Sequence, residues 1–369
     1  IIQGENRYGF PGGGFYGTQN LYWYAGLAFH GDGIDDERAR DFLLKGYENQ
    51  MAVAKHRAKT AGDDGGLAAI VYGYAFGAYP RAEWNFLHTW QSAIGENIAP
   101  RFDYLPGVLN WLAWMIIKDG DTLRYHGTGD AHHTSNTLGS INNSHLLQVR
   151  AFYQDSHPQH ARLAQYLMDI NPSTNRGGYF FADLYPLLIA EPPDPVKPLG
   201  PDETWPTARF FENFGQIFMR SGFSGDDTYV LFTAGAATGN HKHYDENNFL
   251  IYKHGQQVMD TGTRDHASHT TEYYSRTIAH NCILVHMPEE SFPHHWGNLP
   301  EDNDGGQNAV TGSVVEAFET NPQFVYVSSN ATEAYSKKKA RLVHREFLYL
   351  VPDHFVILDR VESTDASLP

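Results

Sequence analysis

Helical and strand-like patterns are segregated along this chain, and that separation limits the architectures it can adopt. Up to about residue 170, apolar residues recur at three- and four-residue spacing, which is the period of an amphipathic helix. After about residue 208, short apolar runs alternate with turn residues about every ten positions, which is typical of strands. Helices first and strands later predict two domains, one helical and one built from antiparallel strands.

The helical part is predicted to be a series of helices joined by short connections, with no strand among them. The predicted helices cover 15–29, 36–59, 65–79, 83–96, 106–117, 144–154 and 158–169. The clearest is 36–59, where Phe42, Tyr47 and Met51 lie on one apolar stripe. Asp35 or Asp36 can cap its first turn.

The second half is predicted to form an antiparallel sandwich. Its strand-like runs are 216–220, 228–233, 249–253, 257–259, 281–286, 314–318, 324–328, 342–351 and 354–358. Between them and the helices, the composition shifts to Pro, Gly and Asp, so 190–207 is predicted to be a linker. The predicted domains are therefore 1–189 and 208–369, and a length of 369 residues is sufficient for two.

Charge and composition exclude several classes of protein. A formal net charge of −16 argues against a general affinity for nucleic acid or anionic membranes. No apolar run is long enough for a membrane span, and no signal peptide is visible. Cys282 is the only cysteine, so no intrachain disulfide can form. The chain opens at Ile1 and stops at Pro369 just after a strand-like run, and we interpret both ends as cuts through a larger protein.

The densest group of chemically active residues lies between positions 239 and 283. His243, Asp260 and His280 each stand at the edge of a strand-like run, and adjacent strands can bring such edges together. Two imidazoles and one carboxylate suit Zn²⁺ with a fourth position left open. His241 lies two residues before His243, so in a strand the two rings would share one face.

A chain with 20 histidines can also place a His-x-His pair on its surface without any function. The whole set is harder to explain in that way, because Asp and His avoid buried strand ends unless they are paired or coordinated.

Three motifs resemble the heparinase II/III-like polysaccharide lyases, and within that family they are closest to heparinase II. They are Asn240-His241-x-His243-x-Asp245, Asp260-x-Gly262, and Arg276-Thr-Ile-Ala-His280-Asn281. The resemblance implies an incomplete (α/α) toroid followed by an antiparallel β-sandwich, with the active cleft between them. It also implies a bacterial periplasmic or secreted enzyme. Gly127-Thr-Gly-Asp130 resembles a turn of the same family, although a Gly-Asp pair is usually no more than a turn.

The activity that the resemblance implies is β-elimination at a 4-linked uronic acid. Heparin or heparan sulfate is the leading substrate, and chondroitin, alginate and ulvan stay open. An anionic polysaccharide or oligosaccharide is therefore the expected partner, and a homodimer is left open. Because the net charge is negative, cations in the cleft would have to be local, from groups such as Lys242, Arg264 and Arg276.

The resemblance also implies catalytic residues. His241 is assigned as the catalytic histidine, and a tyrosine on a toroid helix as base and acid. Tyr72 and Tyr74 point about 200° apart on one helix, so only one can face the cleft, and Tyr74 is preferred.

The resemblance also implies an Asn, His or Glu on an earlier helix, which would neutralise the uronate carboxylate. Asn20 is the preferred residue, with Gln19 and His88 as alternatives that could bind substrate, as Arg276 could. The His-Asn and His-x-x-Glu dipeptides expected of the family are absent here.

Zinc would have a structural role in the family: bound to His243, Asp260 and His280, it would hold the strands that present His241. Two other functions are compatible with the same residues. One is a catalytically weak carbohydrate-binding protein that keeps a structural zinc. The other is a zinc hydrolase in which the three ligands activate water and Glu246 serves as base.

Overall fold

The computed structural model describes residues 21–61, 71–72, 81–131, 135–137, 140–171, 194–202, 204–237, 241–262, 269–295 and 297–368. The chain divides into two compact units. The first comprises Ile1–Trp111 and Gly139–Gly200, and the second Leu112–Leu138 and Pro201–Pro369. Residues 112–138, which the sequence pattern placed with the helices, thus belong to the second unit. The predicted domain limits stay a proposal.

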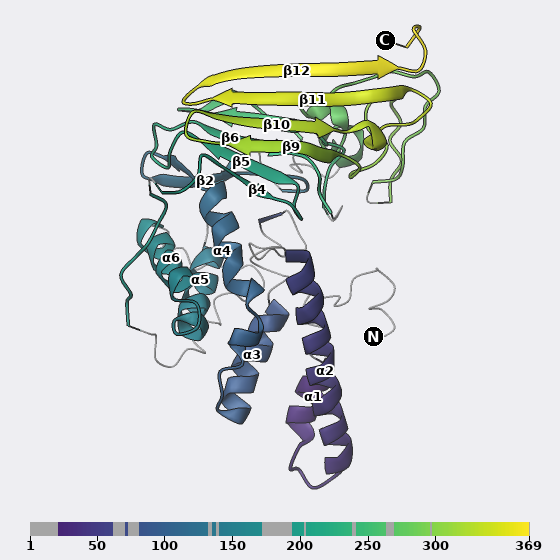
Figure 1. The fold of residues 1–369 in the computed structure, drawn as a ribbon. Helices are drawn as coiled ribbons and strands as arrows, with labels where there is room; N and C mark the ends of the chain where they lie inside the picture. Colours follow the sequence, from purple (N-terminus) through teal and green to yellow (C-terminus); the bar gives the residue numbers. More distant parts are fainter. Residues whose placement is uncertain are drawn as a thin grey trace. The chain divides into compact units, whose positions relative to one another are not determined.

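Helices dominate the first unit, and each α-helix in the described part of the chain lies where the helical period predicted one (Figure 1). The α-helices are α1 (Leu21–Phe29), α2 (Asp36–Ala61), α3 (Arg81–Ile94), α4 (Tyr104–Met115), α5 (Ser140–Tyr153) and α6 (Pro158–Ile170). Asp35 caps α2 by accepting the Arg38 N–H at 3.1 Å. These helices do not by themselves outline a toroid, so that part of the prediction stays a proposal. None of the helices described here is both long and apolar enough to cross a bilayer.

The second unit contains two larger antiparallel sheets that lie in two layers (Figure 1), in addition to a small three-stranded sheet. The first sheet has the order β4-β5-β6-β7-β8, and its strands are Ala208–Phe211, Gln216–Arg220, Tyr229–Thr233, Asn248–Tyr252 and Gln256–Val258. The second has the order β12-β11-β10-β9, and its strands in chain order are Val314–Thr320, Phe324–Asn330, Ala340–Leu350 and His354–Ser363. The predicted antiparallel β-sandwich is confirmed.

One apolar core joins the two sheets. Alternate side chains of each sheet point inward and bury the layer between them. Ile217, Val230 and Phe232 of the first sheet belong to the same buried cluster as Val327 and Phe347 of the second. The rings of Phe232 and Phe347 have centroids 5.6 Å apart. Burial of one such side chain stabilises the fold by about 1.5–3 kcal/mol, so this layer sets the register of the strands above it.

Two predictions of local structure are wrong. Residues 117–137 contain a three-stranded antiparallel sheet of β1 (Ile117–Asp119), β2 (Thr122–His126) and β3 (Ser135–Thr137), where no strand was predicted. β1 and β3 have three residues each, which is too short to show a period of two, whereas β2 has five. Conversely, the run 281–286 is not a strand. Its Val285 N–H bonds to Gly305 O in a loop, at 2.9 Å, instead of joining a ladder.

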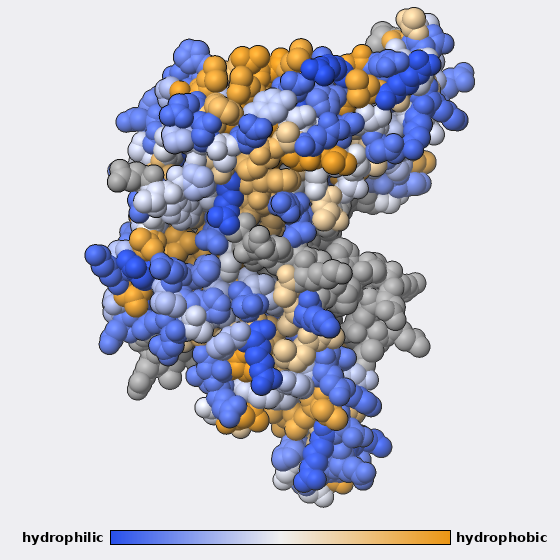
Figure 2. Space-filling view, in the orientation of Figure 1, coloured by the Kyte–Doolittle hydropathy of each residue, from blue (hydrophilic) through white to orange (hydrophobic). Residues whose placement is uncertain are grey.

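Strand β12 is an edge of its sheet and carries exposed apolar side chains. They are Val356, Ile357, Leu358 and Val361. Figure 2 shows hydrophobic atoms gathered along this strand at the top of the view. A long apolar edge is a surface on which another strand can pair.

Candidate active site and metal centre

The histidine motif lies on an irregular segment that leads into β7, not on a strand. His241 has φ 60° and Asn247 has φ 67°, so both residues adopt the left-handed conformation. Outside glycine this conformation costs on the order of 1–3 kcal/mol and persists only where other contacts enforce it. The prediction that His241 and His243 share one face of a strand is therefore wrong, because the backbone turns between the end of β6 and the start of β7.

Hydrogen bonds hold the segment in this conformation. The Tyr244 N–H donates to Ser275 O at 2.9 Å, and the Thr277 hydroxyl donates to Tyr244 O at 2.8 Å. At the other end, the Asn247 N–H donates to Thr233 O at 2.8 Å. The histidines of the motif are thus presented from a rigid frame.

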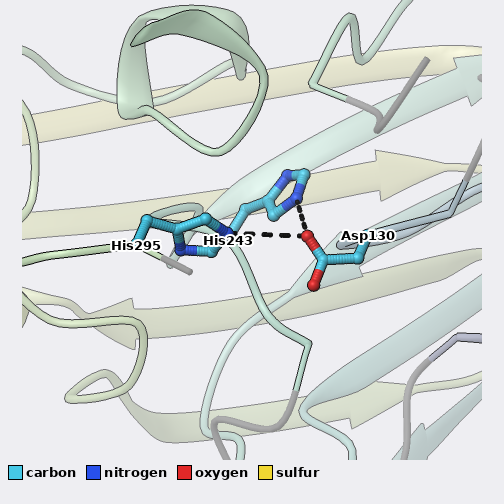
Figure 3. Close-up of side chains that lie close together, drawn as sticks. All are labelled: Asp130, His243 and His295. Carbon is cyan, nitrogen blue, oxygen red and sulfur yellow. Dashed lines mark hydrogen bonds and ion pairs between the residues drawn. The ribbon is translucent and has the colours of Figure 1, made fainter. Parts of the chain in front are cut away.

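Asp130 meets this segment from the loop that follows β2. Gly129 adopts φ 55°, which glycine tolerates, and the turn places the Asp130 N–H 3.1 Å from His241 O. Asp130 Oδ2 lies 2.8 Å from His241 Nδ1, and Oδ1 lies 3.2 Å from His243 Nε2. His295 Nε2 approaches the same Oδ1 at 3.5 Å. Figure 3 shows the His243 and His295 rings both turned toward this one carboxylate oxygen.

The carboxylate of Asp130 is a buried negative charge surrounded by imidazoles. Burial alone would raise the pKa of Asp130, but the contacts with His241, His243 and His295 outweigh it and hold that pKa far below its usual range. The group is therefore ionised at any physiological pH and acts only as an acceptor.

The three predicted metal ligands also lie together. His280 Nδ1 is 2.8 Å from Asp260 Oδ1, and the rings of His243 and His280 have centroids 5.4 Å apart. Burial opposes charge on both members of the Asp260–His280 pair, yet their mutual attraction lowers the pKa of Asp260 and raises that of His280. Within the described part of the chain, His243 Nδ1 and His280 Nε2 have no hydrogen-bond partner. Buried imidazole nitrogens that have no hydrogen-bond partner in the protein are expected where those nitrogens bind a metal ion.

The surroundings of Asp260 are fully ordered by hydrogen bonds. The Asn248 amide donates to Asp260 Oδ2 at 2.7 Å, and the Gly262 N–H donates to Oδ1 at 2.8 Å. Gly262 lies so close to the His280 ring that a Cβ there would come within 2.0 Å of its Cε1. The Asp-x-Gly motif thus serves two purposes, because the aspartate anchors His280 and the glycine leaves room for its ring.

A second set of three ligands shares His243. Asp130, His243 and His295 are all buried, and one candidate ligand atom of each lies within 4.8 Å of the others. Two nitrogens and one carboxylate oxygen suit Zn²⁺ in either set. Within the described residues, the distances among ligand atoms single out Asp130, His243 and His295 as a group that could hold a metal ion, and His243 is the member that this group shares with the predicted set.

Glu246, the candidate base in the zinc-hydrolase alternative, is bonded to residues other than the histidines. Its carboxylate forms a buried ion pair with Lys242 and accepts hydrogen bonds from Ser313 and from the Gly235 N–H. Burial raises the pKa of Glu246, and Lys242 opposes that rise. Glu246 is fully buried and joins Lys242, Ser313 and Gly235, so its environment is that of a structural carboxylate.

The other predicted site residues lie in different surroundings. Arg276 is buried, pairs with Asp304 and has its guanidinium carbon 3.9 Å from the centroid of the Phe292 ring. His88 Nε2, on α3, lies 3.1 Å from Gln148 Oε1, and burial lowers its pKa against the effect of that bond. Tyr72 is buried. Gln19, Asn20 and Tyr74 lie outside the described residues.

Sequence reasoning missed two members of the cluster. Asp130 stood out only as part of a glycine-rich turn, and nothing in the spacing connected it to a histidine 111 positions later. His295 had no signal at all. A reciprocal pair of backbone bonds with Asn298, at 2.8 and 3.0 Å, sets its position.

Comparison with known proteins supports this architecture. Residues 204–367 match the family model described as Heparinase II/III-like, C-terminal. The structure is similar to a crystal structure of heparinase III, with a TM-score of 0.59 and 13% identity over 97% of this chain and 49% of that one. It is also similar to the heparan sulfate lyase HepC from Pedobacter heparinus, with a TM-score of 0.54 and 16% identity over 93% of this chain and 44% of that one.

The chain spans about half the length of these two structures. A search of curated proteins found no match. The similarity of fold extends over nearly the whole chain, while the match to the family model lies in the β-sandwich unit that carries the histidine cluster. Residues 204–367 of this protein are thus similar in sequence to the C-terminal part of the heparinase II/III-like family, and the fold of the chain is similar to that of heparinase III.

Proposed function

We propose that this protein is a polysaccharide lyase that cleaves a 4-linked uronic-acid-containing polysaccharide by β-elimination. The observation that carries the proposal is the position of His241. Its ring is held by Asp130 and its side chain is 12% exposed, whereas the side chains of Asp130 and His243 are fully buried. His241 is thus the member of the cluster best placed to meet a substrate.

The elimination needs three groups. A base removes the proton at C5, a donor stabilises the negative charge that develops on the carboxylate, and an acid protonates O4 as the C4–O4 bond breaks and a C4=C5 double bond forms. In the proposed mechanism Tyr74 exchanges protons with C5 and O4, and His241 is its partner. Asn20 neutralises the carboxylate, with Gln19, Tyr72, His88 and Arg276 as further substrate-binding candidates.

We further propose that the histidine cluster binds Zn²⁺ through His243, Asp260 and His280. The two imidazole nitrogens without partners support this set, and the distances among Asp130, His243 and His295 support a second one. The ion would fix the positions of the histidines and supply a positive charge beside the anionic substrate. Heparin or heparan sulfate is the leading substrate because solved structures of similar fold are a heparinase III and a heparan sulfate lyase, and a periplasmic or secreted location is part of the same proposal.

The experiment is an ultraviolet assay on a panel of heparin, heparan sulfate, chondroitin sulfate, alginate and ulvan. Elimination creates a conjugated uronate, so absorbance should rise on at least one of them. In His241→Ala and Tyr74→Phe the rate should fall by a factor of about 10²–10⁴, the usual contribution of a general acid–base group. His354→Gln, at an exposed histidine, is the control and should keep the wild-type rate.

A folded, zinc-loaded protein that releases no unsaturated sugar from any member of the panel would contradict the lyase proposal. Binding of one polysaccharide without cleavage would then favour a carbohydrate-binding function. Release of saturated ends would favour hydrolysis, although the enclosure of Glu246 argues against it.

A further inference from the structure

We propose that Asp130 is a positioning residue that holds His241 in one tautomer and ring orientation and connects it to His243. The proposal rests on the function proposed above, in which His241 takes part in proton transfer. It adds a residue that neither the sequence motifs nor the family match assigned.

Two separate contacts join Asp130 to His241. The carboxylate Oδ2 accepts from Nδ1 at 2.8 Å, and the Asp130 N–H donates to His241 O at 3.1 Å. One contact orients the ring, and the other holds the backbone of a residue whose φ of 60° is unfavourable without support. Both depend on the turn at Gly129, whose positive φ directs Asp130 toward the histidine.

The chemistry of the contact fixes the tautomer. A carboxylate oxygen is a hydrogen-bond acceptor, so the 2.8 Å contact of Asp130 Oδ2 with Nδ1 of His241 places the ring proton on Nδ1. Any proton that His241 exchanges with substrate then passes through Nε2. A histidine free to change tautomer would present the correct nitrogen for only part of the time.

The second oxygen of Asp130 extends the arrangement to the candidate metal centre. Oδ1 lies 3.2 Å from His243 Nε2, and His243 Nδ1 has no hydrogen-bond partner within the described part of the chain (Figure 3). Histidines that bind a metal through one nitrogen generally donate the other N–H to a carboxylate. Asp130 therefore orients His243 for the metal through Oδ1 and orients His241 for the substrate through Oδ2.

The first test uses the wild-type protein loaded with Zn²⁺. Nitrogen-15 NMR of the imidazoles, assigned by the loss of signals in His241→Gln, should show His241 protonated at Nδ1 with Nε2 as the exchanging nitrogen. Protonation at Nε2, or a mixture of both tautomers, would overturn the proposal. This measurement does not depend on any substrate, so it tests Asp130 even if the lyase proposal fails.

The second test is Asp130→Asn, with Asp227→Asn as the matched control. Asp227 is an aspartate of the same unit that accepts bonds from Ser221 and Ser224 and is remote in function from the histidines. In Asp130→Asn we expect kcat to fall by about 10²–10⁴ with KM within about threefold and zinc content unchanged. The His241 signals should shift toward the Nε2-protonated form. Asp227→Asn should leave all four readouts unchanged.

Three outcomes of the second test would overturn the proposal. Wild-type kcat in Asp130→Asn would show that His241 needs no positioning. A loss of zinc together with activity would make Asp130 a metal ligand instead. A rise in KM with unchanged kcat would make it a substrate-binding residue. If the wild-type protein cleaves no polysaccharide, the tautomer shift in Asp130→Asn remains the deciding measurement.

Discussion

Buried histidines have two different roles in this protein, and the chemistry around each one decides which. In the second unit, His241, His243 and His295 surround the carboxylate of Asp130, and His280 pairs with Asp260. In the first unit, His145 is buried and accepts the Trp84 indole N–H at 2.7 Å through Nδ1. Against the effect of burial, the carboxylate of Asp260 raises the pKa of His280, whereas burial lowers the pKa of His145 and keeps that ring neutral.

The pH dependence of stability should reflect His145. Burial lowers its pKa to about 3 from the usual value of 6.5. Below pH 6.5 the imidazole of His145 therefore binds a proton in the unfolded chain but stays unprotonated in the folded chain. The associated stability is fully present above pH 6.5 and is lost as the pH falls toward 3, by about 2 kcal/mol at pH 5.

His145→Gln keeps an acceptor for Trp84 but cannot be protonated. Urea unfolding followed by tryptophan fluorescence at pH 7 and pH 5 should give a smaller loss for this variant than for the wild type. The exposed His354→Gln should behave as the wild type. An equal loss in His145→Gln and wild type would show that other groups control the acid sensitivity.

At the scale of elements, single polar residues join helices that are otherwise packed through apolar faces. Glu83 of α3 forms a buried ion pair with Arg57 of α2 and accepts the Tyr104 hydroxyl of α4 at 2.9 Å. Burial and the negative charge of Glu83 raise the pKa of Tyr104 well above its usual range, so that hydroxyl stays a donor. One carboxylate thus sets the mutual position of three helices.

Glu83→Gln should destabilise the protein by about 3–5 kcal/mol, because it removes the charge that compensates a buried guanidinium. Tyr104→Phe, which removes only a hydrogen bond to the same carboxylate, should cost about 1 kcal/mol. Denaturant unfolding of the two variants measures the difference. Equal costs would mean that the ion pair contributes no more than a neutral hydrogen bond.

At the scale of the whole molecule, the path of the chain assigns the candidate metal centre to one unit. The chain leaves the helical unit after Trp111, contributes Asp130 to the second unit, returns at Gly139 and leaves again after Gly200. All the histidines and carboxylates of the two ligand sets come from the second unit. Binding of a metal should therefore stabilise that unit alone.

Metal analysis after dialysis against Zn²⁺ tests this directly. We expect bound zinc in the wild type and its loss in His243→Ala, because His243 belongs to both ligand sets. Loss in Asp260→Ala and His280→Ala but not in His295→Ala would select the predicted set, and the reverse would select the set with Asp130. Hydrogen exchange should become faster on chelation in residues 241–295 and stay unchanged in α2 and α3. Full zinc in His243→Ala would remove the metal from this site.

Local patterns in the sequence were sufficient for the elements and for part of the site. The period of apolar residues placed α1–α6 and most strands of the sandwich, because burial of one face imposes a period on any helix or half-buried strand. The same reasoning grouped His243, which precedes β7, with Asp260, which follows β8. His280 adjoins no strand in the described part of the chain and reaches Asp260 from the end of a 3-10 turn at Thr277–Ala279. It failed for β1 and β3, which are too short to show a period, for β2 between them, and for 281–286, where Val285 bonds to a loop.

What the sequence determined by itself is therefore the order of helices and strands, the sandwich and the identity of the histidine motif. Only the tertiary structure decided that Asp130 reaches His241 and His243, and that His295 joins them. The physical reason is that a local pattern records which face of an element is buried but not which distant residue covers it. The turn at Gly129 and the left-handed backbone of His241 bring Asp130 and His241 together, and neither feature produces a periodic pattern in the sequence.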